Sequence, residues 1–176
     1  MDDPTKLAAV GLSGVIVVIM VLSMLIGLNS AQETLTSQAF GHGNLRLCGI
    51  YLNRGRFILL AFYIPFAAIA AAFSEKILVA FGQDEEVSHL TNVYVWAALP
   101  AVIFYSQYDL YKRWLACQRI TFVPMVAMFI GTSLHVPFCY LYVKYFDLGL
   151  IGLGVASSSK DLIILISVMI YGNCSA

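Results

Sequence analysis

The sequence predicts an all-α integral membrane protein that forms one transmembrane domain over residues 1–176 and crosses the bilayer about five times. Hydrophobic residues make up 60% of the chain and charged residues only 11%, whereas a soluble domain carries about 25% charged residues. The mean hydropathy is +0.84. Five stretches are apolar over roughly the 20 residues that a helix needs to cross the hydrocarbon core. So little polar surface is incompatible with a water-soluble fold.

The predicted spans are helices, because a segment in lipid has to satisfy its own backbone hydrogen bonds. They cover residues 7–32, 57–74, 90–108, 120–143 and 148–171. The first span follows an acidic start and is too long for the apolar region of a signal peptide, so we interpret it as a retained span. Kinks are expected where prolines fall within the later spans, namely at Pro65, Pro100, Pro124 and Pro137.

Basic residues predict the orientation of the spans. One group follows the first span and another follows the third: Arg46, Arg54, Arg56, then Lys112, Arg113, Arg119. Lysine and arginine favour the cytoplasmic side, so both segments, with Cys48 and Cys117, should face the cytoplasm. The segment between the second and third spans is acidic and should face outward. The N-terminus then lies outside, which leads us to expect that a preceding span is missing from these 176 residues.

The cysteines and the overall charge argue against several other classes of protein. Neither a CxxC pair nor a zinc-type spacing with histidine is present, so we expect small apolar residues in or near the spans rather than a metal site or a cofactor. The four cysteines are Cys48, Cys117, Cys139 and Cys174. The formal net charge is zero and no basic patch with interleaved aromatic residues occurs, so nucleic-acid binding is not predicted.

Residues 27–41 carry a family resemblance. They read GLNSAQETLTSQAFG, which resembles the signature of the multidrug and toxic compound extrusion (MATE) transporters: an acidic residue with Thr-Leu, then Gln, a small residue, an aromatic residue and Gly. Further segments resemble family motifs in the same order: 49–54 (GIYLNR, with Asn53 where the family has Gln), 81–84 (FGQD), 97–100 (AALP), 115–118 (LACQ) with Pro124, and 148–152 (LGLIG).

This resemblance implies both a fold and a function. Members of the family have twelve helices in two six-helix lobes, and the five spans match helices two to six of the first lobe, in agreement with the orientation. The implied function is that of a proton- or sodium-coupled antiporter that exports organic, often cationic, solutes from a plasma or organelle membrane, not that of an enzyme. Helix one and the second lobe are absent from these residues, together with many of the acidic residues that couple the family to cations.

Four residues are candidates for coupling or transport: Glu33, Gln38, Lys160 and Asp161. Ionisable side chains at membrane depth are costly and mark functional candidates. Lys160 and Asp161 interrupt the last span, and because adjacent helical residues point about 100° apart, each should need another partner or water. Glu33 lies near the cytoplasmic end of a long helix, where a packing hydrogen bond is the alternative interpretation.

Other polar residues in the spans have simpler interpretations. Interhelical hydrogen bonds are favoured over substrate contact for Asn29 and Gln32, and the same alternative holds for Gln38. His135 is more simply a hydrogen-bonded core residue than a switch. Asp109 and Gln107 lie beside Lys112 and Arg113, where local charge balance explains them.

Two functional hypotheses therefore remain open from the sequence. In the first, the chain contributes to an exporter that works by the rocking of two lobes. In the second, it is a truncated remnant that does not transport, or a structural membrane subunit. Because alternating access in the family needs two lobes around a central site, we expect these 176 residues alone not to export substrates.

Overall fold

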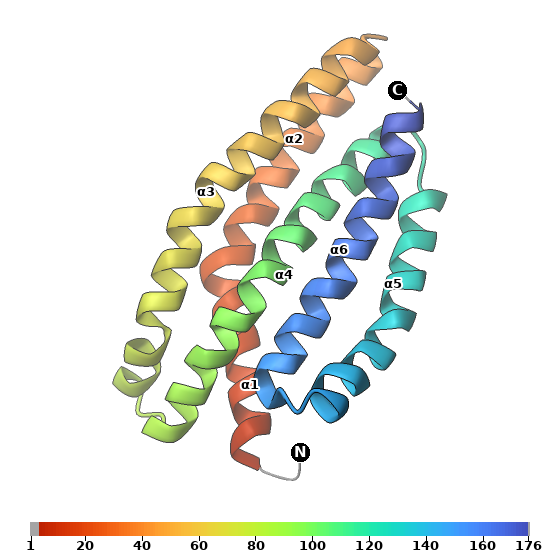
Figure 1. Ribbon diagram of the computed structural model, residues 1–176. Coiled ribbons are helices and arrows are strands. Elements are labelled where there is room, and N and C mark those ends of the chain that lie inside the picture. The colour runs from red at the N-terminus through yellow and green to blue at the C-terminus, as the bar shows by residue number, and fades with distance from the viewer. Residues whose placement is uncertain (1–3, 176) are drawn as a thin grey trace.

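The computed structural model describes residues 4–175 and, within them, is helical with short connections (Figure 1). The elements are α1 (Pro4–Val17), the π-helical turn η1 (Val18–Leu22), α2 (Ser23–Gly41), α3 (Leu45–Ala80), α4 (Glu85–Cys117), α5 (Phe122–Tyr140), the π-helical turn η2 (Leu141–Tyr145) and α6 (Gly149–Ser175). The side chain of Cys174 lies outside the described side chains. The predicted all-α membrane fold is confirmed.

Five helices in the described part are long and apolar enough to cross a membrane, with α1, η1 and α2 counted as one. The first three are longer than the predicted spans, and the last two have the predicted length of 24 residues. Helix α3 has 36 residues and α4 has 33, which at 1.5 Å per residue is about 50 Å against a hydrocarbon core of about 30 Å. The ends of these helices therefore project beyond the hydrocarbon core. Many large apolar side chains point outward, among them Phe57, Ile64, Phe129 and Ile170, as expected of a surface in contact with lipid.

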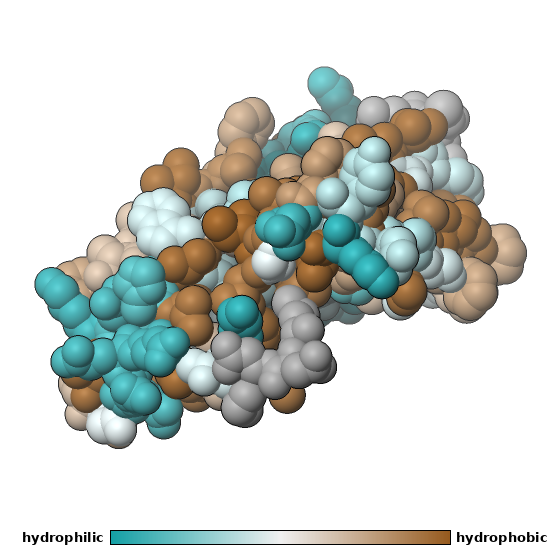
Figure 2. All heavy atoms as spheres, turned by 60° about the horizontal axis from the view of Figure 1, so that its bottom comes forward, coloured by the Kyte–Doolittle hydropathy of each residue, from teal (hydrophilic) through white to brown (hydrophobic). Residues whose placement is uncertain are grey.

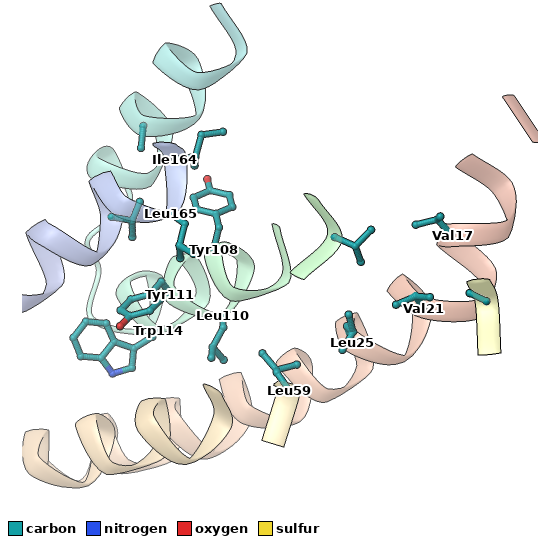
Figure 3. Packing of buried hydrophobic residues seen from close by; sticks show 14 of the residues in the cluster. Val17, Val21, Leu25, Leu59, Tyr108, Leu110, Tyr111, Trp114, Ile164 and Leu165 are labelled. Carbon is teal, nitrogen blue, oxygen red and sulfur yellow. The ribbon is translucent and has the colours of Figure 1, made fainter. Parts of the chain in front are cut away.

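Helix α4 occupies the centre of the bundle. It packs against α1, α2, α3 and α6, while α5 packs against α6, and Figure 1 shows α2 and α3 on one side of α4 with α5 on the other. Tyr108, Tyr111 and Trp114 of α4 are buried beside Leu110, opposite Leu25 of α2 and Leu165 of α6 (Figure 3). Large side chains of α4 thus pack both against α2 and against α6.

Two polar ends follow from this up-and-down arrangement. The α2–α3 and α4–α5 connections lie at the end where Figure 1 marks the C-terminus, and the N-terminus lies at the other end with the α3–α4 connection. Figure 2 shows hydrophilic side chains gathered at the α3–α4 end, next to a broad hydrophobic surface. The two arginine-bearing segments, at the α2–α3 and α4–α5 connections, share the opposite end, as the predicted orientation requires. The assignment of that end to the cytoplasm stays a prediction.

Several helices contain interruptions of regular α-helical geometry. Within η1 the backbone is π-helical, and the hydroxyl of Ser23 donates to the carbonyl of Val18 at 2.7 Å. Pro65, Pro100 and Pro137 lie inside helices, and the hydroxyl of Tyr63 donates to the carbonyl of Leu99, beside Pro100, at 2.7 Å. A proline removes one backbone donor from the helix, and the bond from Tyr63 ties α3 to α4 next to that position.

Gly154 allows α6 to lie directly on the backbone of α4. A Cβ atom at this position would lie 2.6 Å from the Cβ of Ala97 and 2.7 Å from its carbonyl oxygen. Small residues permit this kind of close approach between membrane helices.

We therefore predict that Gly154→Ala lowers the free energy of unfolding in detergent by about 1–3 kcal/mol, because the backbone of α4 has to move to admit a methyl group. Thermal unfolding of the purified chain measures the effect. Gly27→Ala is the matched control: no atom lies within 4 Å of its added Cβ, so stability should stay equal or rise by up to about 1 kcal/mol through helix propensity. Equal melting temperatures for the two variants would contradict the close contact.

The orientation also has a direct test. Cys48 is only 1% exposed, so it cannot report on the side of the membrane, whereas Phe81 and Leu45 lie at opposite ends and are 82% and 62% exposed. In a chain whose native cysteines are replaced by alanine, an impermeant maleimide should label Phe81→Cys in intact cells. It should label Leu45→Cys only after permeabilisation. The reverse pattern would invert the topology, and the cysteine-free parent chain gives the background signal.

Candidate functional site

The carboxylate of Asp109 is the centre of a polar network near the end of α4. Asp109 is 3% exposed and accepts from three side chains. Arg113 Nε donates to Oδ2 at 2.8 Å and Asn29 Nδ2 to the same oxygen at 3.0 Å, while Lys112 Nζ lies 2.7 Å from Oδ1. These donors come from both α2 and α4, so the carboxylate joins the two helices.

Glu33 enters the same network through Arg113. Arg113 Nη1 lies 2.6 Å from Glu33 Oε2 and also donates to the hydroxyl of Ser30 at 3.3 Å. The side chain of Glu33 is 43% exposed, so water reaches it as well. Two carboxylates and two basic groups then balance each other, and the network carries no net charge.

Helical spacing brings these groups together. Asn29 and Glu33 are four residues apart on α2, and Asp109 and Arg113 are four apart on α4, so each pair occupies one face of its helix. An acidic residue four positions before a basic one is also the favourable order for a pair on a helix. Because α2 and α4 pack together, the two faces meet. Asn29 donates further to the carbonyl of Ser106 at 3.2 Å.

A cavity of about 770 Å³ lies beside this network. Its polar side is formed by Glu33, Lys112 and Arg113, and the rest is largely aromatic and apolar, including Tyr105 and Phe129. The cavity lies between the end of α4 and the first half of α5. Its charged lining is one carboxylate, already paired with Arg113, and two basic groups, so the aromatic and apolar side chains supply the surface that an organic solute would cover.

The second cluster lies within α6. Asp161 is 6% exposed, and Lys160 Nζ lies 3.0 Å from Asp161 Oδ1. The expectation that these neighbours would each need another partner is therefore wrong. The long lysine side chain bends back to its neighbour's carboxylate, although the two Cα–Cβ bonds diverge.

Two residues of α5 complete the surroundings of this ion pair. His135 lies close enough to interact electrostatically with both Lys160 and Asp161, and its Nε2 is 3.5 Å from the sulfur of Cys139. Tyr94 of α4 interacts with Cys139 and with Ser157 of α6. The cluster thus gathers three helices around one buried carboxylate, and no hydrogen bond or ion pair of the described residues joins it to the Asp109 network.

Gln38 and Gln32 fall outside both clusters. Gln38 is exposed, and its side chain has no hydrogen bond within the part of the chain that the structure describes. Gln32 makes an interhelical bond, from Nε2 to the carbonyl of Tyr51 at 2.8 Å, and Asn29 does so with α4, as expected for both. Among residues 4–175 no group of three or more His, Cys, Asp or Glu is placed to hold a metal ion.

The sequence did not predict that Asp109 and Arg113 bond to α2. Local charge balance is part of the arrangement, since Lys112 and Arg113 do pair with Asp109. The further links, to Asn29 and Glu33, depend on which faces of α2 and α4 meet. The available signal was the spacing of four residues within each pair.

Comparison with known proteins places the chain in a family. The MatE family model matches residues 1–141. The chain is similar to multidrug and toxin extrusion protein 1 of Xenopus tropicalis, with 37% identity over 94% of this chain and 29% of that protein. It is also similar to protein DETOXIFICATION 49 of Arabidopsis thaliana, with 32% identity over 85% of this chain and 30% of that protein.

The fold agrees with these matches. The crystal structure of the eukaryotic MATE transporter AtDTX14 superimposes with a TM-score of 0.88 and 23% sequence identity, over 95% of this chain and 37% of that chain. This chain therefore spans less than a third of the length of the two curated relatives. The family match over most of the chain, together with the five membrane-spanning helices, shows that it is a multi-pass integral membrane protein of the MATE family.

Proposed function

We propose that this chain acts as part of a secondary active transporter that exports organic or xenobiotic solutes in exchange for protons or sodium ions. The observation that carries the proposal is the match of the MatE family model to residues 1–141. The Xenopus relative is named as a multidrug and toxin extrusion protein. The five spans would correspond to helices two to six of one six-helix lobe. Transport would then require a second lobe, so that a site between the lobes opens alternately to each side.

Within this lobe, we assign ion coupling to Asp161 and Lys160. A buried carboxylate paired with a partly exposed lysine, far from the ends of α6, is expensive in lipid and is expected where ions or protons move. Protonation of the Asp161 carboxylate would cancel its charge and release the ammonium group of Lys160, which would then have to seek water or another acceptor. Such a change at the contact between α5 and α6 can bias two arrangements of these helices. A proton needs this carboxylate only, whereas sodium would need several further oxygen ligands.

Glu33 has a different part in the proposal. Its carboxylate is bound to Arg113 and is partly exposed, at the border of the 770 Å³ cavity. We assign it the link between α2 and α4 at the wall of the cavity, because Arg113 already balances its charge. Gln38 lies further along the same helix and offers an exposed amide near the cytoplasmic entrance.

The assignment of Asp161 predicts a spectroscopic change. Acidification of the purified chain should produce the infrared carbonyl band of a protonated carboxylic acid, part of which disappears in Asp161→Asn. The neighbouring Lys160, His135 and Cys139 contribute no such band, so the difference reports on the carboxyl group alone. Glu33→Gln serves as the matched control and should leave the Asp161 component in place. Identical pH difference spectra for the parent chain and Asp161→Asn would refute proton exchange at this residue.

The need for two lobes predicts the behaviour of the isolated chain. Proteoliposomes that contain only these 176 residues should release a fluorescent organic cation no faster than empty liposomes, under either a proton or a sodium gradient. The Xenopus relative, reconstituted in the same way, controls the assay. Gradient-driven release by the short chain would show that one partial lobe suffices, and its loss in Glu33→Gln would move the coupling role to Glu33.

Coexpression distinguishes the proposal from its alternative. If the chain is a working part of a transporter, supplying the remaining segments of a relative should restore gradient-driven export. If it is a remnant or a structural subunit, export should stay at background even when both parts reach the membrane and copurify. The second result would reject the transport function for this chain.

A further inference from the structure

A groove between α2 and α3, on the side of α2 that faces away from the 770 Å³ cavity, has no part in the proposed transport mechanism. The volume of this groove is about 290 Å³. Its walls are mostly apolar and its one charged lining residue is Arg54. The lining residues are Leu28, Ala31, Gln32, Leu35, Tyr51, Arg54, Gly55, Ile58 and Leu59. Several of these are exposed, so the groove opens to the surface of the bundle.

Small residues create the groove. Gln32 of α2 reaches across to the carbonyl of Tyr51 on α3 and lies directly over Gly55. A Cβ atom at Gly55 would overlap the amide of Gln32, so only glycine leaves room for this crossing. Ala31, next to Gln32, presents a single methyl group to the opening. A larger side chain at Ala31 would fill the space.

The position and charge of Arg54 indicate what the groove can hold. Arg54 is exposed and precedes by three residues the start of the predicted span at Phe57, a rise of about 4.5 Å along a helix. It lies on the predicted cytoplasmic side. No acidic group of the described residues forms an ion pair with it, in contrast to Arg113, which is paired with both Glu33 and Asp109. A guanidinium group without a counter-ion therefore stands directly above apolar walls that descend into the hydrocarbon region.

We propose that this groove binds one anionic phospholipid of the cytoplasmic leaflet. The lipid phosphate would accept from the guanidinium of Arg54, whose planar donors suit phosphate oxygens. An acyl chain would lie along Leu28 and Ile58, toward the membrane interior. Charge complementarity selects an anionic headgroup, since a basic residue at this surface attracts anionic lipids. The apolar walls select a lipid over a free phosphate, which would leave them uncovered.

Native mass spectrometry of the purified chain tests the proposal. Dioleoyl-phosphatidylserine and dioleoyl-phosphatidylcholine share the same acyl chains and differ in net charge, so competition between them isolates the headgroup. The parent chain should retain phosphatidylserine about fivefold better, as one basic contact at the surface predicts. Arg54→Gln should reduce this preference to near unity. Arg46→Gln, which removes an exposed arginine of the same helix that lines a different cavity, should preserve it.

A second variant tests the groove itself. Ala31→Phe should displace the tightest bound lipid of either kind, with unchanged helical circular dichroism, because the ring occupies the place of the acyl chain. Three outcomes would overturn the proposal: no preference for phosphatidylserine in the parent chain, equal loss of preference in Arg54→Gln and Arg46→Gln, or unaltered lipid retention in a folded Ala31→Phe. The equal loss would indicate diffuse surface charge rather than a site.

Discussion

The carboxylate of Asp109, on the membrane helix α4, is buried against α2, where an unpaired negative charge would be strongly destabilising. Its three donors, from α2 and α4, remove that cost. Lys112 and Arg113 belong to α4 itself, so only the bond from Asn29 requires α2 to lie against α4 at one register, with Asn29 level with Asp109. The same register brings Glu33 to Arg113. Two interhelical bonds, Asn29 to Asp109 and Arg113 to Glu33, therefore favour one relative position of the two helices that carry most of the polar network.

Asp161 is also a buried carboxylate that needs a donor, but it is held by fewer groups than Asp109. Asp109 has three side-chain donors, whereas Lys160 is the one side-chain donor that the described residues offer to Asp161. Removing one donor from Asp109 leaves two in place, but moving Lys160 leaves Asp161 with none. A carboxylate held by one flexible lysine is easier to switch than one held by three groups from two helices. This difference is why coupling is assigned to α6 and fastening to α2 and α4.

Sequence reasoning gave the membrane class, the five helices and the family, because each depends on local signals: apolar length, basic segments and short motifs in order. It did not give the partners of Asp109, which depend on how two helices rotate against each other. The Lys160–Asp161 contact was missed for another reason. The angle between adjacent Cα–Cβ bonds on a helix does not limit the reach of a lysine side chain, whose ammonium group can return to its neighbour.

The segment that carries the family resemblance also acts as a connector between helices. Gln32 bonds to α3, through the carbonyl of Tyr51, while the next residue, Glu33, bonds to α4 through Arg113. Adjacent residues on a helix point about 100° apart, so α2 needs only these two positions to hold a neighbour on each flank. The bond to α3 depends on Gly55 and forms the floor of the groove, and the bond to α4 borders the larger cavity. A change in how α2 lies between its neighbours would therefore alter both the groove and the cavity.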